Sequence, residues 1–64
     1  MTLRDLILKM PADENLVVRR LGETERLETT PEEIINEYED LQHTTVEMIW
    51  TSHNVLRAIV IEVR

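Results

Sequence analysis

With 64 residues, 42% of them apolar and 31% charged, the chain is too apolar for a disordered tail and long enough for one domain, residues 1–64. It contains no cysteine, which excludes disulfides and makes a partner chain the leading external aid for so small a core. Its formal net charge is −6. No run approaches the roughly 20 apolar residues that cross a bilayer, so we expect a complete, cytoplasmic protein without membrane contact.

The first predicted element is a short helix over residues 2–10. Thr2 and Asp5 have the spacing of a Thr-x-x-Asp capping arrangement, in which the two residues satisfy each other's backbone N–H groups. Apolar residues recur behind this cap at helical spacing and form one stripe. Pro11 ends the helix, because it cannot continue the hydrogen-bond ladder.

Two strands joined by a turn are predicted next. The apolar run Leu16–Val18 begins a strand that continues to Leu21, and Gly22, the only glycine, indicates a hairpin turn. Residues 25–29 form the predicted return strand. Because Leu27 is its only apolar residue, we expect a short, exposed edge strand.

The clearest local signal is the start of a second helix, predicted over residues 31–41. Thr30 supplies an N-cap oxygen, Pro31 occupies the first helical position, and Glu33 has the spacing to reach back to the cap amide. The helical period then predicts four inward side chains, those of Ile34, Ile35, Tyr38 and Leu41.

The last third predicts an antiparallel hairpin of residues 44–51 and 55–63, with its turn at Ser52-His53-Asn54. Residues 59–61, Ile-Val-Ile, are apolar on both faces, which predicts a central strand covered on both sides or covered by another copy. The whole order is α-β-β-α-β-β. It predicts an α+β fold, a small two-layer sandwich of helices on an antiparallel sheet.

The residue inventory argues against an enzyme. The only serine, Ser52, adjoins His53 in the predicted turn, where a hydroxyl normally satisfies local backbone groups. Glu39 and His43 are spaced i, i+4, but a zinc site needs three or four protein ligands, and we favour His43 as a residue that ends the helix. We therefore predict no catalytic residue, no metal site and no cofactor.

The negative charge is concentrated in residues 23–40. Eight acids and Arg26 give this segment a net charge of −7, whereas the remaining residues sum to +1. Such a segment disfavours direct nucleic-acid binding and suits a basic partner. The helix dipole accounts for Glu32 and Glu33. We predict that the other six acids form a surface that binds a basic site on a protein partner: Glu23, Glu25, Glu28, Glu37, Glu39 and Asp40.

We also predict that the chain self-associates, most simply as a dimer, because its core is small. The alternative hypothesis for its function is a structural homo-oligomer assembled through the apolar C-terminal hairpin. Its candidate contacts are Trp50, Ile59, Val60 and Ile61. Trp50 and Met48 suit an exposed recognition patch, but a lone tryptophan is more often a core residue, and we favour a partly exposed core position for it. Salt separates the two hypotheses, because it weakens charge-driven association and spares apolar strand pairing.

Both ends of the chain carry short stretches with a resemblance to other proteins. They are LRDLI at residues 3–7, MPADE at residues 10–14 followed by Val17 and Val18, and IVIEV at residues 59–63. These stretches resemble small proteins of unknown function encoded by phages and integrated mobile elements of Gram-positive bacteria. The resemblance implies an accessory protein, and acidic proteins of that provenance include inhibitors that imitate nucleic acid. It transfers no functional residues.

Overall fold

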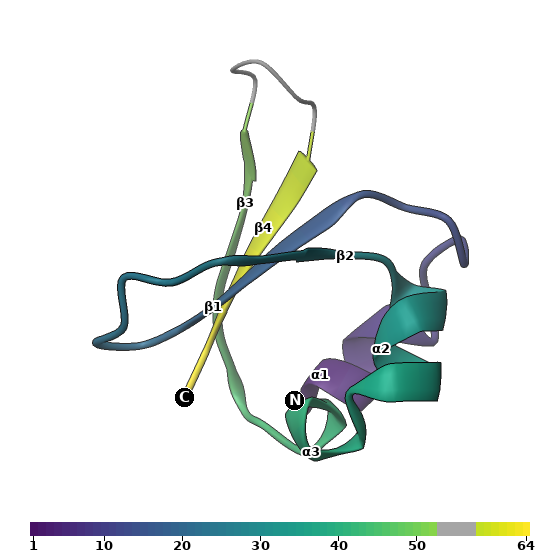
Figure 1. The fold of residues 1–64 in the computed structure, drawn as a ribbon, viewed down its shortest axis with the longest axis horizontal. Helices are drawn as coiled ribbons and strands as arrows, with labels where there is room; N and C mark the ends of the chain where they lie inside the picture. The colour runs from purple at the N-terminus through teal and green to yellow at the C-terminus, as the bar shows by residue number, and fades with distance from the viewer. Residues whose placement is uncertain (53–57) are drawn as a thin grey trace.

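The computed structural model describes residues 1–52 and 58–64. The predicted turn residues His53 and Asn54 and the start of the predicted last strand, residues 55–57, lie outside the described residues. The described helices and the four-stranded sheet form an α+β fold, as the sequence predicts (Figure 1). In chain order the elements are α1 (Leu3–Ile7), β1 (Leu16–Arg20), β2 (Leu27–Thr29), α2 (Pro31–Glu37), α3 (Glu39–Gln42), β3 (Val46–Ser52) and β4 (Ala58–Val63).

The sheet is mixed, and the predicted purely antiparallel sheet is wrong. Its strand order is β2-β1-β4-β3, with antiparallel pairs at the two ends and a parallel β1–β4 pair in the middle. The parallel register runs from Leu16 opposite Ile59 to Arg20 opposite Val63. A strand that is apolar on both faces is most stable in a central position, which β4 reaches by pairing with β1.

The first helix begins as predicted and ends earlier. The Asp5 N–H donates to the Thr2 hydroxyl oxygen (3.2 Å), and the Thr2 N–H donates to the Asp5 carboxylate (3.3 Å), which completes the capping box. The α-helix ends at Ile7, and turns continue the chain to Met10. Its apolar stripe buries Leu3 and Ile7 almost completely.

The predicted second helix is broken in two. Thr30 caps α2 as expected, accepting from the Glu33 N–H at 3.2 Å. The Glu33 carboxylate accepts from the Thr29 hydroxyl (3.0 Å), and its predicted contact with the cap amide is replaced by this bond. At Tyr38 the backbone leaves the helical region, with φ −124° and ψ 59°, and α3 starts in a new direction.

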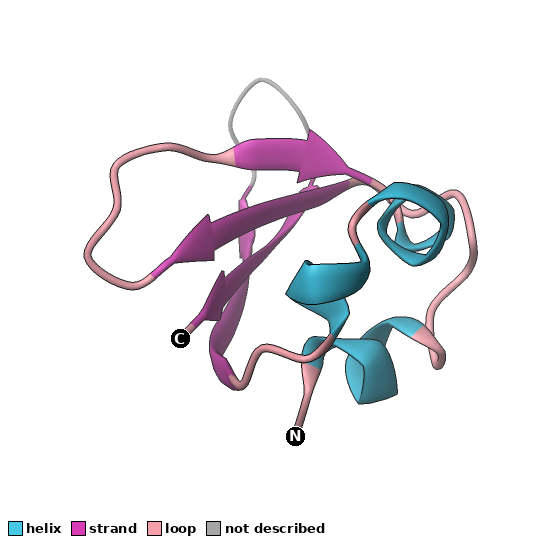
Figure 2. Ribbon diagram, turned by 60° about the horizontal axis from the view of Figure 1, so that its bottom comes forward, coloured by secondary structure: helices cyan, strands magenta, loops and turns pink. Residues whose placement is uncertain are grey.

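The helices cover one face of the sheet (Figure 2). Ile34 and Leu41 are buried as predicted. Ile35 is 42% exposed, so its predicted inward position is wrong. The buried cluster joins helix residues to one face of β1 and β4: Leu3, Ile7, Leu16, Val18, Ile34, Leu41, Ile61 and Val63.

The opposite face of the sheet carries Val60 at its centre, with Trp50 of β3 as its cross-strand neighbour. Trp50 is 40% exposed and lies outside the buried cluster, which corrects the preference for a core position. Arg19 and Glu62 form an ion pair across β1 and β4 on this face, and the Arg19 Nε is buried without a hydrogen-bond partner among the described residues.

Candidate functional site: an acidic hollow beside β2

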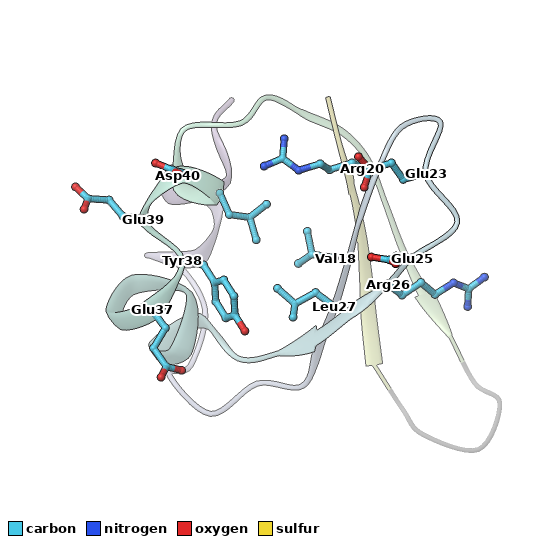
Figure 3. A pocket seen from close by; sticks show the side chains of 11 residues that line it. Val18, Arg20, Glu23, Glu25, Arg26, Leu27, Glu37, Tyr38, Glu39 and Asp40 are labelled. Carbon is cyan, nitrogen blue, oxygen red and sulfur yellow. The ribbon is translucent and has the colours of Figure 1, made fainter.

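A hollow of about 600 Å³ lies between the β1–β2 hairpin and the break that joins α2 to α3 (Figure 3). One wall comes from β1, the hairpin loop and β2. The other comes from the last residue of α2, Tyr38 and the start of α3. The two walls are far apart in the chain, so the hollow exists only in the folded protein.

Five of the six acids predicted to form a binding surface line this hollow. All five are exposed, and they come from both walls: Glu23, Glu25, Glu37, Glu39 and Asp40. Glu28 is the exception. It is the middle residue of β2 and lies opposite Val17, so strand alternation directs its side chain to the face of the sheet that the helices leave uncovered.

The interior of the hollow is apolar. Val18 and Leu27 line it from the sheet, and Leu41 and the half-buried Tyr38 line it from the helices. Figure 3 shows the Tyr38 ring facing Leu27 across the opening. An apolar interior beneath exposed carboxylates suits an elongated cation, because the aliphatic stem of lysine or arginine packs on apolar surface while its charged end stays near the acids.

Two arginines share the site with the five acids, which leaves a formal net charge of −3 around the hollow. Arg20 extends across one end of the opening, whereas Arg26 points away from it (Figure 3). Neither forms an ion pair with a described residue. The ion pairs of the described chain, Arg19–Glu62 and Glu47–Arg64, involve residues outside the lining of the hollow.

The hairpin wall depends on Gly22. This residue has φ +83°, a left-handed conformation that side chains disfavour, and the turn closes with the Glu23 N–H donating to the Arg20 carbonyl at 3.1 Å. The predicted glycine turn is therefore confirmed. It carries the chain back towards β2 and sets Glu23 and Glu25 on the rim of the hollow.

The helical wall depends on Gln42, a residue that sequence reasoning passed over. It is 3% exposed, and its amide nitrogen donates to the carbonyls of Ile34 and Ile35, both at 3.2 Å. Its amide oxygen accepts from Arg4 at 3.0 Å. These bonds hold α3 against the end of α2 and against α1, which fixes how far Glu37 and Asp40 stand apart. A glutamine between Leu41 and His43 carries no sequence signal of burial.

Metal ligation and a perturbed carboxyl pKa are the other chemical features to consider at this site. Among the described residues, no three His, Cys, Asp or Glu side chains are arranged to hold a metal ion. His43 ends α3 as predicted. The perturbed carboxyl group lies elsewhere: the backbone N–H of Thr2, and then its hydroxyl, hold the pKa of Asp5 below its ordinary value of 3.8.

The candidate self-association residues are separated by the fold. Ile61 is fully buried beneath the helices, Val60 is 7% exposed, and Ile59 is half-buried. Of the four candidate residues, Trp50 is the most exposed, and its neighbours Met48 and Ile49 are exposed as well. The side chains that remain free for a partner on the hairpin therefore belong to β3 rather than β4.

No protein-family model, curated protein or solved structure matches the chain. None of the described helices is long and apolar enough to cross a membrane.

Proposed function

We propose that this protein is a non-enzymatic interaction module whose acidic hollow binds a basic segment of a protein partner. The observation that carries the proposal is the convergence of five unpaired acids from residues 23–25 and 37–40 on one opening with an apolar interior. Like charges gathered at one opening repel one another, and the two arginines of the lining compensate them only in part, which leaves the net charge of −3. A bound cation relieves that repulsion.

The chemistry of the hollow favours arginine or lysine side chains as the bound groups. The stem of such a side chain packs against Leu27 and Leu41, and its cation lies against the Tyr38 ring, an attraction worth about 0.5–1 kcal/mol at exposed sites. The surrounding carboxylates raise the association rate more than they lower the dissociation rate of the complex. The resemblance of both chain ends to phage and mobile-element proteins supports a role as an accessory or inhibitor protein.

The test compares two variants with the same net charge in their binding to a fluorescent peptide of alternating arginine and serine. One variant neutralises acids of the hollow: Glu23→Gln, Glu25→Gln, Glu37→Gln and Asp40→Asn. The matched control neutralises four acids outside its lining: Asp13→Asn, Glu14→Gln, Glu28→Gln and Glu32→Gln.

Fluorescence anisotropy at low salt should show association with the hollow variant slowed about 10-fold or more relative to the control, because exposed charges mainly steer encounter. Raising the salt to about 0.15 M should weaken wild-type binding and shrink the difference between the variants. Equal binding by the two variants would contradict the proposal, because net charge rather than the hollow would then account for the affinity.

A further inference from the structure

The second edge of the sheet is formed by β3, whose strand neighbour in the described chain is β4 alone. Two hydrogen bonds fix the direction of the β4 backbone. The Ile59 N–H donates to Asn15 (3.1 Å), and the Val63 carbonyl accepts from Leu21 (2.8 Å), both on the β1 side. Backbone N–H and carbonyl groups alternate in direction from one residue of a strand to the next. Those of Val60 and Glu62 therefore point towards β3.

This alternation determines which residues of β3 face outward. Val60 and Glu62 lie opposite Trp50 and Met48, so those two residues of β3 use their peptide groups to bond β4. Ile49 lies between them. Its N–H and carbonyl therefore point away from β4 in the plane of the sheet, where another strand can add to the edge.

The side chains of this edge are apolar on both faces. Met48 is 57% exposed and Trp50 40% exposed on the face that the helices leave uncovered, and Ile49 is 45% exposed on the other. Natural edges are usually protected by lysine, proline or unpaired charge. This strand has neither lysine nor proline, and its one charged residue, Glu47, is paired with Arg64 at 2.7 Å.

The N-terminus limits the length of the open edge. The Val46 N–H donates to the Met1 carbonyl and the Leu3 N–H donates to the Thr44 carbonyl, both at 2.9 Å, so the chain itself occupies the beginning of this edge. The β3–β4 register is also irregular at this end of the strand, between Val46 and Met48. A strand added from outside therefore pairs with the part of β3 centred on Ile49, residues 47–50.

We infer that β3 pairs antiparallel with β3 of a second copy, around a two-fold axis at Ile49. That register sets Met48 of each copy opposite Trp50 of the other on the uncovered face, and the two Ile49 side chains adjoin on the helix side. Thioether–aromatic contacts of this kind stabilise by about 0.3–1.5 kcal/mol each. The strand is thus complementary to itself, with its own exposed side chains filling both faces of the new pair.

Charge explains why a second copy fits this edge despite a net charge of −6 on each chain. Both nearby carboxylates are paired, Glu62 with Arg19 and Glu47 with Arg64. The hollow lies beside β2, three strands away, or roughly 14 Å at 4.8 Å per strand. Dimerisation through β3 therefore keeps the two acidic hollows apart and leaves both open, so this inference is independent of the function proposed above.

The assembly closes at two copies. A two-fold axis uses the same edge of both chains, and the remaining edge of each sheet is β2, a three-residue strand that carries the exposed Glu28. Two four-stranded sheets would thus join into one continuous sheet with short, charged outer edges.

The test is sedimentation of the full chain over a wide concentration range, with two matched variants. Ile49→Lys places a charge at the proposed axis. Ile35→Lys places the same charge on α2 at a residue of nearly equal exposure, 42% against 45%. We expect the wild type and Ile35→Lys to reach twice the 7.6 kDa chain mass at high concentration, and Ile49→Lys to dimerise at least about 10-fold more weakly.

A wild-type monomer at every concentration would overturn the inference and favour a strand from a different protein on this edge, and equal dimerisation by both variants would also overturn it. Trp50 fluorescence gives a second measurement that needs no variant. Dilution of the wild type should shift its emission to the red as the Met48 of the other copy departs. Dimer dissociation without any shift would exclude β3 as the interface.

Discussion

The two edges of the sheet present opposite surfaces to the outside. Beside β2, acids from two separate segments surround a hollow and form no ion pairs with described residues. Along β3, the exposed side chains are apolar, and the neighbouring charges of Glu47 and Glu62 are paired. A domain of 64 residues thus has one edge suited to charge-driven binding and another suited to apolar strand pairing.

A small acidic chain can carry both surfaces without conflict, because they respond differently to salt. Charge-driven association is weakened by salt, whereas apolar strand pairing is not. Because β1 and β4 stand between the two edges, a change at one edge should leave the other intact. Stability is best measured in the Ile49→Lys background, in which dimerisation is weakened.

The largest expected effect comes from Gln42→Leu, which keeps the volume of the side chain and removes its amide. The carbonyls of Ile34 and Ile35 then lose a donor, and Arg4 loses its acceptor. We expect urea denaturation to show a loss of about 1–3 kcal/mol, the cost of leaving a buried polar group unsatisfied. Arginine-peptide binding should weaken as well, because the helical wall of the hollow loosens.

Gln42→Glu identifies which of these hydrogen bonds matters. A carboxylate still accepts from Arg4 but cannot donate to the two carbonyls. It should therefore destabilise the domain at neutral pH. A stabilising effect would show that the Arg4 contact, rather than the bonds across the break, holds α3 in place.

The next effect is that of Thr30→Ala, which removes the cap of α2. The Glu33 N–H loses its acceptor at 3.2 Å, and we expect a loss of about 0.5–2 kcal/mol in the free energy of unfolding. Thr30→Ser is the control, since it retains a capping hydroxyl. Equal denaturation midpoints for wild type and Thr30→Ala would exclude Thr30 as the cap.

A smaller effect distinguishes the two arginines of the hollow. Arg20→Gln removes a cation that extends across the opening, whereas Arg26→Gln removes one that points away from it (Figure 3). We expect Arg20→Gln to strengthen arginine-peptide binding by about fivefold at most, given that exposed charge pairs contribute about 0.2–1 kcal/mol. Arg26→Gln should have the lesser effect, and the reverse order would place the bound cation outside the hollow.

The smallest effect concerns the α1 cap. The Thr2 N–H lowers the pKa of Asp5, so the ionised carboxyl stabilises the fold above its ordinary value of 3.8 and loses that contribution as the pH falls through the lowered pKa. Asp5→Asn should therefore be less stable than the wild type at neutral pH, with the difference vanishing in acid. A difference that persists unchanged at low pH would assign the effect to packing instead of charge.

Local signals account for the parts of the fold that sequence predicts. The Thr2 and Thr30 caps and the Gly22 turn each depend on residues close together in the chain, and each is confirmed. The period of two likewise identifies the β3–β4 hairpin. The parallel β1–β4 pair was missed because it joins residues about forty positions apart, and no local pattern encodes which strands meet.

The break at Tyr38 was missed for a related reason. Residues 31–41 contain no glycine or internal proline, so helical periodicity continues through the break, and the bonds that stabilise it come from Gln42. That break is what brings Glu37 and Asp40 to the same hollow as Glu23. Charge counting therefore predicted a surface of six acids, five of which gather at the hollow. It predicted neither the hollow itself nor the position of Glu28 on the other face of the sheet.

The independence of the two edges is tested most directly by sedimentation of the wild-type protein with the fluorescent arginine–serine peptide, from about 0.01 to 1 M salt. We expect the peptide to sediment with the dimer at low salt and to dissociate from it at high salt, while the dimer itself persists. Loss of peptide and dimer together over the same salt range would contradict it, because a single charge-dependent interface would then account for both associations.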